Sequence, residues 1–270
     1  MPDVDVALEG RLAEDTALLI EAVREAGALA LSLFRTDVRN WIKGKSSPVS
    51  EADLAVNDLL ARRLRSATPN YGWLSEESAD DPARLARPRV WIVDPIDGTR
   101  SYLAGQEDWS VSVGLVEGDA PLLGAVFAPV TGELFFAARG EGARRNDAPI
   151  RAAAGARLDP GRIVGPKPLV QRLGEALEPG PLHPRIGSLA LKICRAAEGR
   201  LDAAFAGGHS HDWDLAAADL IVHEAGGTMT SLSGEAVVYN RPEVKHEPLV
   251  AAGRERHARI VAHFRRSPPV

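Results

Sequence analysis

Apolar residues at three- and four-residue steps mark the first elements of the chain. The spacing over residues 4–34 predicts a long amphipathic helix, with apolar positions at Leu12, Leu18, Leu19, Ala22, Val23, Ala26, Leu29, Ala30 and Leu33. A second helix is predicted over residues 51–66, and Leu54, Leu59, Leu60 and Leu64 form its apolar face. Ser50 is the predicted N-cap of this helix, because Asp53 follows three residues later and completes a capping box.

The pattern changes to short apolar runs after Pro69-Asn70. Residues 71–74 and 89–94 read as short buried strands, separated by a polar, acid-rich stretch. Three further strands joined by turns are predicted at 110–117, 122–128 and 133–138. The two helices are therefore followed by a segment that forms sheet.

The second half of the chain mixes helices and strands. Residues 140–185 are rich in Gly, Pro and Arg, and predict only one strand over 162–165 and a short helix near 169–177. Helices are then predicted at 187–199, 212–225 and 254–265, with strands at 201–205, 228–231 and 249–252. The whole pattern indicates a layered fold of the α+β or α/β class.

Composition narrows the class of protein. The chain has 270 residues, 32 basic and 37 acidic, for a net charge of −5, and we expect one domain over residues 1–270. The acidic balance argues against binding a nucleic-acid polymer. No apolar run approaches the ~20 residues of a membrane span, and the acidic N-terminus lacks the basic region of a signal peptide. The single cysteine, Cys194, excludes an internal disulfide framework. A cytoplasmic location is expected.

The strongest chemical signal is Asp94-Pro95-Ile96-Asp97-Gly98-Thr99, which follows a predicted strand. The strand delivers Asp94 at its carboxyl end, a common ligand-binding position in open sheets. Two carboxylates three residues apart can converge on one hard cation such as Mg²⁺. Gly98 and Thr99 open a short helix over 100–103, with Thr99 as its cap, and the free N–H groups there suit a phosphate. The same residues also fit a plain Asp-Gly turn with a threonine cap.

Two more acidic segments have both a structural and a chemical interpretation. Glu76 and Glu77 follow the first predicted strand, and a solvated acidic loop accounts for them. Asp212 and Asp214 open a predicted helix, where Asp212 fits an N-cap and Asp214 a first-turn acid that favours the helix dipole. From the residues alone, both interpretations stay open.

Taken together, the motifs resemble those of the inositol monophosphatase superfamily of metal-dependent, lithium-sensitive phosphatases. The similarity rests on Ser75-Glu76-Glu77-Ser78, on Asp94–Thr99, and on Trp213-Asp214-Leu215-Ala216-Ala217-Ala218 with Glu224-Ala225-Gly226-Gly227. The motifs occur in the family's order over residues 40–230. The resemblance implies an α-β-α-β-α sandwich, in which residues 1–140 carry most of the metal site and residues 141–270 complete it. It also implies a homodimer.

The resemblance further implies a site with two or three Mg²⁺ ions. The implied ligands are the side chains of Glu76, Asp94, Asp97 and Asp214 and the carbonyl of Ile96. Thr99 with Asp53 would orient and deprotonate the attacking water, and the N–H groups of Gly98 and Thr99 would bind phosphate. The family's threonine near Asp53 is replaced here by Ser50. All of the family's acidic positions are present, which argues against a non-catalytic metal- or phosphate-binding regulator.

The implied substrate is a small phosphorylated metabolite. Leu74-Ser75-Glu76-Glu77 and the segment Gly187–Cys194 resemble the 3′(2′),5′-bisphosphate nucleotidases, although the second has one spacing difference. Arg100 and Lys192 are candidates for a second phosphate, and Ser188 for a further substrate contact. These residues favour hydrolysis of adenosine 3′,5′-bisphosphate to AMP. Inositol monophosphate and histidinol phosphate remain alternatives.

Overall fold

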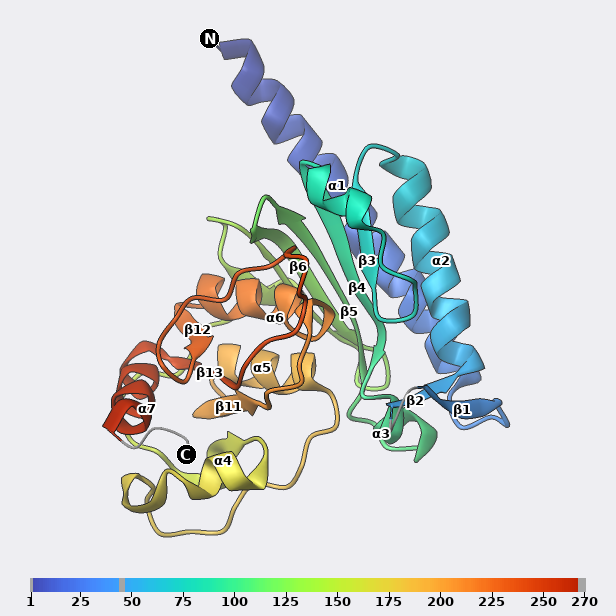
Figure 1. Cartoon of the computed structure of the whole chain (residues 1–270). Helices are drawn as coiled ribbons and strands as arrows, with labels where there is room; N and C mark the ends of the chain where they lie inside the picture. The colour runs from blue at the N-terminus through green and yellow to red at the C-terminus, as the bar shows by residue number, and fades with distance from the viewer. Residues whose placement is uncertain (1, 44–46, 267–270) are drawn as a thin grey trace.

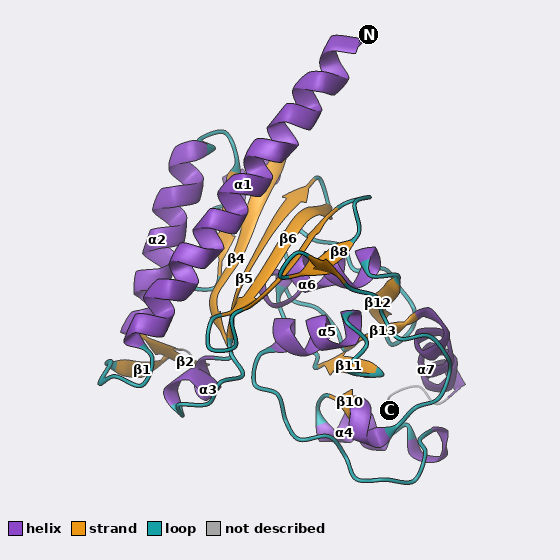
Figure 2. Cartoon of the chain, turned by 180° about the vertical axis from the view of Figure 1, so that it is seen from behind, coloured by secondary structure: helices purple, strands orange, loops and turns teal. Residues whose placement is uncertain are grey.

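Helical layers and sheets alternate in the computed structural model (Figure 1). The structure describes the backbone of residues 2–43 and 47–266 and the side chains of residues 11–43 and 48–266. Helices α1 and α2 cover one face of a seven-stranded sheet, and α5 and α6 cover the other (Figures 1 and 2). A four-stranded sheet follows, and α7 packs on its outer side. The predicted α-β-α-β-α sandwich is confirmed.

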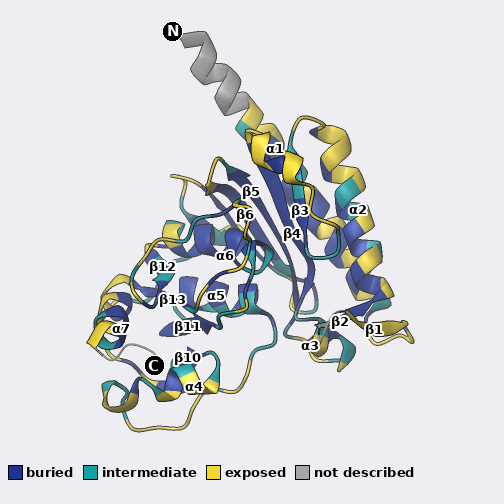
Figure 3. Cartoon of the chain, in the orientation of Figure 1, coloured by how far each residue is buried: buried dark blue, intermediate teal, exposed yellow. Residues whose placement is uncertain are grey.

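The first layer consists of α1 (Pro2–Leu33) and α2 (Glu51–Ala67). Leu19, Ala22, Val23, Ala26 and Ala30 of α1 are buried, because their spacing of three or four residues places them on the face toward the sheet. Ser50 caps α2 in a capping box with Asp53, as predicted. Figure 3 shows the burial continuing into the strands behind these helices.

The large sheet has the strand order β3-β4-β5-β6-β7-β8-β9. Its strands are β3 (Gly72–Ser75), β4 (Arg89–Asp97), β5 (Ser110–Glu117), β6 (Ala120–Ala128), β7 (Glu133–Ala138), β8 (Ala143–Arg145) and β9 (Ala148–Pro149). Only β3 and β4 pair in parallel; the other neighbours are antiparallel. The β8–β9 hairpin was not predicted. Its turn is formed by Asn146 and Asp147, both with positive φ.

Strand β4 is longer than its apolar run. The prediction that Asp94 ends the strand and that 95–99 form a turn is wrong, since pairing resumes at Asp97 opposite Ser110 after a register shift between Asp94 and Asp97. Pro95 has no N–H to donate to a neighbouring strand, and a bulge accommodates this gap. Asp94 and Asp97 therefore both lie at the carboxyl end of β4, on either side of the register shift.

The middle helical layer packs against the large sheet at two glycines, Gly114 and Gly124. Helix α6 (Asp212–Glu224) is buried along most of its length, and α5 (Leu189–Ala197) lies beside it. A Cβ at Gly124 would lie 2.6 Å from the carbonyl oxygen of Ala217, so only glycine lets α6 approach this closely. The apolar core on this side draws residues from both halves of the chain.

The four-stranded sheet has the order β10-β11-β13-β12. Its strands are β10 (Ile163–Val164), β11 (Ala203–Ala206), β12 (Gly227–Ser231) and β13 (Leu249–Gly253), followed by α7 (Arg254–Arg266). The short helix predicted near 169–177 is present, but its extent differs: α4 (Lys167–Gln171) ends early, and a 3₁₀ turn, η3 (Gly174–Ala176), follows it. Gly174 has φ +48°, a conformation that interrupts a right-handed helix.

The remaining elements are short. A hairpin of β1 (Asn40–Lys43) and β2 (Ser47–Ser50) was not predicted, nor were the 3₁₀ turns η1 (Pro82–Ala86) and η2 (Pro160–Arg162). Helix α3 (Thr99–Leu103) follows β4. Among the described residues, no helix combines the length and apolar character needed to cross a bilayer.

Candidate active site

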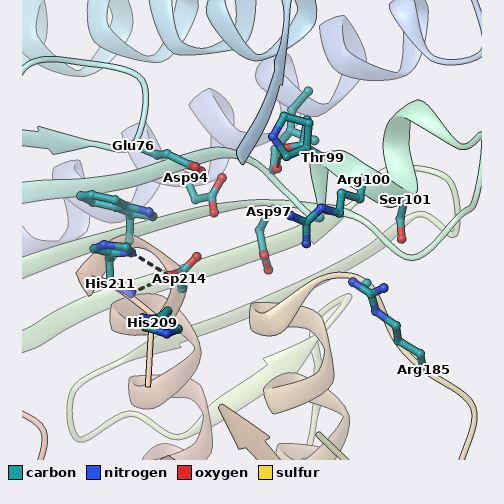
Figure 4. Close-up of a pocket in the computed structure, with 15 residues that line it drawn as sticks. Glu76, Asp94, Asp97, Thr99, Arg100, Ser101, Arg185, His209, His211 and Asp214 are labelled. Atoms are coloured by element: carbon teal, nitrogen blue, oxygen red, sulfur yellow. Dashed lines mark hydrogen bonds and ion pairs between the residues drawn. The ribbon is translucent and has the colours of Figure 1, made fainter. Parts of the chain in front are cut away.

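A cavity of about 560 Å³ opens where the two sheets' connecting segments converge. The loop after β3, the bulge of β4, α3 and the segment leading into α6 all reach it (Figure 4). Its lining consists of Pro48, Glu76, Asp94, Ile96, Asp97, Gly98, Thr99, Arg100, Ser101, Arg185, Gly187, His209, His211, Trp213 and Asp214. Most of the residues predicted from the sequence motifs therefore meet in one cavity.

Three carboxylates form the centre of this cavity. Asp94, Asp97 and Asp214 each offer an oxygen atom within 4.8 Å of the other two. Asp94 is 1% exposed and Asp97 is 6% exposed. Oδ1 of Asp94 has no hydrogen-bond partner among the described residues, which is costly for a buried charged oxygen unless a cation compensates. An all-oxygen donor set of this kind fits a hard divalent cation.

The electrostatics of the cavity point the same way. Burial, and then the charges of Glu76, Asp97 and Asp214, raise the pKa of Asp94 well above its ordinary value. Burial and Asp214 raise the pKa of Asp97 to about 6. Burial and Asp214 also raise the pKa of Glu76 to about 8. The carboxylates repel one another, and a bound cation would relieve that repulsion.

Glu76 faces the same cavity from the loop after β3 (Figure 4). It stands outside the tight group of three carboxylates. Lys43 of β1 donates to the backbone carbonyl of Glu76 and lies 3.2 Å from Oε2 of Glu77. Lys43 was missed from the sequence, since it lies 33 residues from Glu76 and no local pattern links the two.

Thr99 and Asp53 come together from α3 and α2. The hydroxyl oxygen of Thr99 lies 3.1 Å from both Oδ1 of Asp53 and the carbonyl oxygen of Ile96. Burial raises the pKa of Asp53 to about 6. The prediction that Thr99 caps the short helix is wrong. Gly98 is the cap, at φ 97°, which frees the Thr99 hydroxyl to contact Asp53.

Asp97 is held by the start of α5. The N–H of Leu189 donates to Oδ1 of Asp97 at 3.1 Å, and the N–H of Ala190 donates to Oδ2 at 2.6 Å. The hydroxyl of Ser188 also donates to Oδ2. Ser188 is 0% exposed, so its position does not fit the substrate contact predicted for it.

The start of α6 differs from its prediction. His211, rather than Asp212, is the N-cap. Asp212 instead lies 2.6 Å from Nε2 of His246. Oδ2 of Asp214 accepts a hydrogen bond from the N–H of His211 at 2.6 Å. The His211 ring stacks on Trp213, with centroids 4.6 Å apart and planes 9° apart, and both rings border the cavity.

Basic side chains lie on the side of the cavity opposite Glu76 and His211 (Figure 4). Arg100 and Arg185 line the cavity. A second cavity of about 480 Å³ shares Arg185 and Gly187 with the first, and Lys192 lines it together with Lys167 and His183. The pKa of the Lys192 ammonium is lowered, because the effect of burial outweighs the opposing effect of the Asp97 carboxylate. Arg185 was missed from the sequence, because the segment 140–185 has no recognisable motif.

Comparisons with known proteins agree with this geometry. A family model described as the inositol monophosphatase family matches residues 11–268. Inositol monophosphatase 1 of Solanum lycopersicum is 32% identical over 241 residues, covering 85% of this chain and 88% of the relative. The 3′(2′),5′-bisphosphate nucleotidase CysQ of Aggregatibacter actinomycetemcomitans is 30% identical over 236 residues, covering 83% and 87%.

Solved structures share the fold over nearly the whole chain. The Thermotoga maritima IMPase superposes with a TM-score of 0.80 at 25% identity, covering 94% of this chain and 97% of that one. SaIMPase-II with bound 2′-AMP has a TM-score of 0.78 at 25% identity and covers 93% of each chain. SaIMPase-II has also been solved with bound inositol monophosphate.

Proposed function

Because the chain belongs to the inositol monophosphatase family of metal-dependent phosphatases that hydrolyse phosphate monoesters, we propose that it is a Mg²⁺-dependent 3′(2′),5′-bisphosphate nucleotidase. The proposed reaction converts adenosine 3′,5′-bisphosphate to AMP. One observation carries the choice of substrate: the carboxylate cavity adjoins a second, basic cavity through Arg185 and Gly187.

The second cavity suits a substrate with two anionic groups. Lys192, Lys167 and His183 line it beside apolar side chains such as Ile186 and Leu182. A single phosphate ester bound at the three aspartates leaves this positive charge unused. A bisphosphorylated nucleotide would place one phosphate at the aspartates and extend its other phosphate or its base toward Lys192.

The proposed metal ligands are Glu76, Asp94, Asp97, Asp214 and the carbonyl of Ile96. The unpartnered Oδ1 of Asp94 and the mutual repulsion of the carboxylates support this assignment. Bound Mg²⁺ would supply Lewis acidity to the phosphate oxygens and lower the pKa of the attacking water. We propose two or three ions, with Asp94 at the centre of the ligand set because it is the most deeply buried of the carboxylates.

The chain's own residues would move the proton of the attacking water. Oγ1 of Thr99 accepts that proton while its own proton passes to Oδ1 of Asp53, 3.1 Å away. A raised pKa makes Asp53 a better proton acceptor than an exposed aspartate. Gly98 and Thr99 line the cavity, and their backbone N–H groups would donate to the phosphate oxygens.

Inositol monophosphatase activity is the second candidate. The tomato relative carries that name at 32% identity, and SaIMPase-II binds both inositol monophosphate and 2′-AMP. Histidinol phosphate is a third possible ester. A non-catalytic regulator is disfavoured, since Glu76, Asp94, Asp97, Thr99 and Asp214 are all present.

A phosphate-release panel tests the substrate. It compares adenosine 3′,5′-bisphosphate, inositol 1-phosphate, histidinol phosphate and fructose 1,6-bisphosphate, each with Mg²⁺ and with EDTA. Lys192→Gln is expected to lower kcat/KM for the bisphosphate nucleotide about tenfold, as expected for the loss of one charged contact, and to leave inositol 1-phosphate unaffected. Lys245→Gln, outside both cavities, serves as the control. Preference for inositol 1-phosphate, with no effect of Lys192→Gln, would overturn the nucleotidase assignment.

Three broader properties belong to the same proposal. We propose that residues 1–270 act as a single catalytic unit, which the shared apolar core supports. A cytoplasmic location is consistent with the lone, buried Cys194. A homodimer is proposed from the family resemblance, and sedimentation of the purified protein would test it.

A further inference from the structure

The carboxylate of Asp97 is nearly saturated with hydrogen bonds from α5. An ionised carboxylate has two oxygens with about four lone-pair positions. Oδ2 of Asp97 accepts from the hydroxyl of Ser188 and the N–H of Ala190, which uses both of its positions. Among the described residues, Oδ1 accepts only from the N–H of Leu189. One position, on Oδ1, is therefore left for a further ligand.

The hydroxyl of Ser188 is itself fixed in direction. Its oxygen accepts the N–H of Leu191 at 2.9 Å, as the N-cap of α5. It also lies 2.9 Å from the hydroxyl of Ser110 on β5. A hydroxyl has one proton and two lone pairs. With Leu191 and Ser110 as donors, the Ser188 proton is directed to Asp97.

The backbone on either side of Ser188 is also held. The N–H of Ser188 donates to the carbonyl of Asp108 at 2.9 Å, and the N–H of Gly187 donates to the Asp108 carboxylate. Ser188 and Ser110 are both fully buried, so water does not replace these contacts. The Asp97 carboxylate is thus oriented by a segment 91 residues away in sequence.

We propose that Ser188 is a positioning residue for the metal site, whose hydroxyl occupies Oδ2 of Asp97 and leaves Oδ1 as the only oxygen of that carboxylate available to a divalent cation. The Asp97 carboxylate then presents Oδ1 toward Asp94 and Asp214. It does not rotate to exchange Oδ1 for Oδ2. This inference rests on the proposed metal site. Beyond that site, it assigns the orientation of the Asp97 carboxylate to Ser188, the N-cap of α5.

Direct binding of Mg²⁺ to metal-free protein tests the proposal. Isothermal titration calorimetry is carried out on the wild type, Ser188→Ala, Ser188→Gly and Ser188→Thr, with no substrate present. Loss of an outer hydrogen-bond partner of a metal ligand lowers metal affinity by about 10–100-fold. We expect at least about a tenfold loss for the Ala and Gly variants, and recovery in Ser188→Thr, which keeps the hydroxyl.

Two comparisons separate this role from a merely structural one. Ser231→Ala removes a buried hydroxyl from β12, outside the carboxylate cavity. The Ser231 hydroxyl contacts Ser233 and the N–H of Glu235, so Mg²⁺ affinity should stay unchanged. Ser188→Gly retains a favourable N-cap residue, and it keeps the test open if Ser188→Ala does not fold.

The outcomes are distinct. A folded Ser188→Ala or Ser188→Gly that binds Mg²⁺ as tightly as the wild type overturns the positioning role. Failure of Ser188→Thr to recover affinity also overturns it, since that variant preserves the donor. A wild type that binds no Mg²⁺ would instead overturn the proposed metal site.

Discussion

The hydroxyl oxygen of Thr99 lies 3.1 Å from Oδ1 of Asp53, although 46 residues separate them in sequence. If the two relay one proton, Thr99→Val and Asp53→Asn should each lower kcat by about 10²–10⁴-fold, the range expected for a positioned acid–base group. The double variant should lose little more than either single variant, because residues that act as a unit are not additive. Steady-state phosphate release at saturating Mg²⁺ measures these values.

Thr36→Val is the matched control for Thr99→Val. Thr36 is exposed and its hydroxyl donates to the carbonyl of Leu33, away from the candidate site, so activity should be unchanged. Multiplicative losses in the double variant would contradict a shared relay, since they would mean that Thr99 and Asp53 act independently.

Asp94→Asn should abolish activity while leaving the protein folded. It removes the charge at the centre of the proposed ligand set, and several kcal/mol of transition-state stabilisation depend on metal ions in such sites. We expect phosphate release to fall by at least about 10²-fold. Asp58→Asn, on the exposed side of α2, is the control, and near-normal turnover of Asp94→Asn at saturating Mg²⁺ would refute the two-metal site.

The metal-free protein should lose stability as pH rises. The pKa values of Asp53 and Asp97 are raised to about 6, and that of Glu76 to about 8. These groups bind more protons in the folded than in the unfolded state, so their contribution is complete below about pH 4 and is lost as pH rises through 6 to 8. The loss is on the order of a few kcal/mol for each group.

Thermal denaturation in EDTA between pH 5 and 8.5 measures this effect. The melting temperature should fall across that range, and Mg²⁺ should restore it at pH 8 because cations offset the carboxylate charges. Glu76→Gln should flatten the part of the curve nearest pH 8. A melting temperature in EDTA that rises from pH 5 to 8 would show that the carboxylates are not destabilising when ionised.

A cluster of ion pairs connects α5 with strand β7 of the large sheet. Arg195 donates to Glu133 of β7 and lies 2.7 Å from Glu198, and all three side chains are largely buried. Glu133 and Glu198 would keep their ion pairs with Arg145 and Arg200 in Arg195→Ala. We therefore expect a cost of about 1–3 kcal/mol, the range for the loss of charged hydrogen bonds from buried groups. Urea unfolding measures the change. Arg62→Ala, at an exposed position of α2, is the control and should change the free energy of unfolding little. A cost under about 1 kcal/mol for Arg195→Ala would mean that the cluster behaves as exposed ion pairs do.

Local pattern was sufficient for most helices and strands. The limits of α2, β5 and β7 follow from apolar spacing and from the capping box at Ser50 and Asp53. Prediction from local pattern failed where the backbone departs from the regular spacing of apolar residues. The bulge carries β4 past Pro95, and the hairpins β1–β2 and β8–β9 have no apolar alternation to reveal them.

The sequence by itself determined the layered class of the fold, because apolar periodicity is a local signal. It also singled out the acidic residues of the candidate site, because the motifs that contain them resemble those of the family in type and order. Only the tertiary structure decided which groups share one site. Ser188 reaches Asp97 across 91 residues, and Lys43 reaches Glu76 across 33. Such contacts depend on how α5 and the β1–β2 hairpin pack against β4, and packing is a property of the whole core that no short segment encodes.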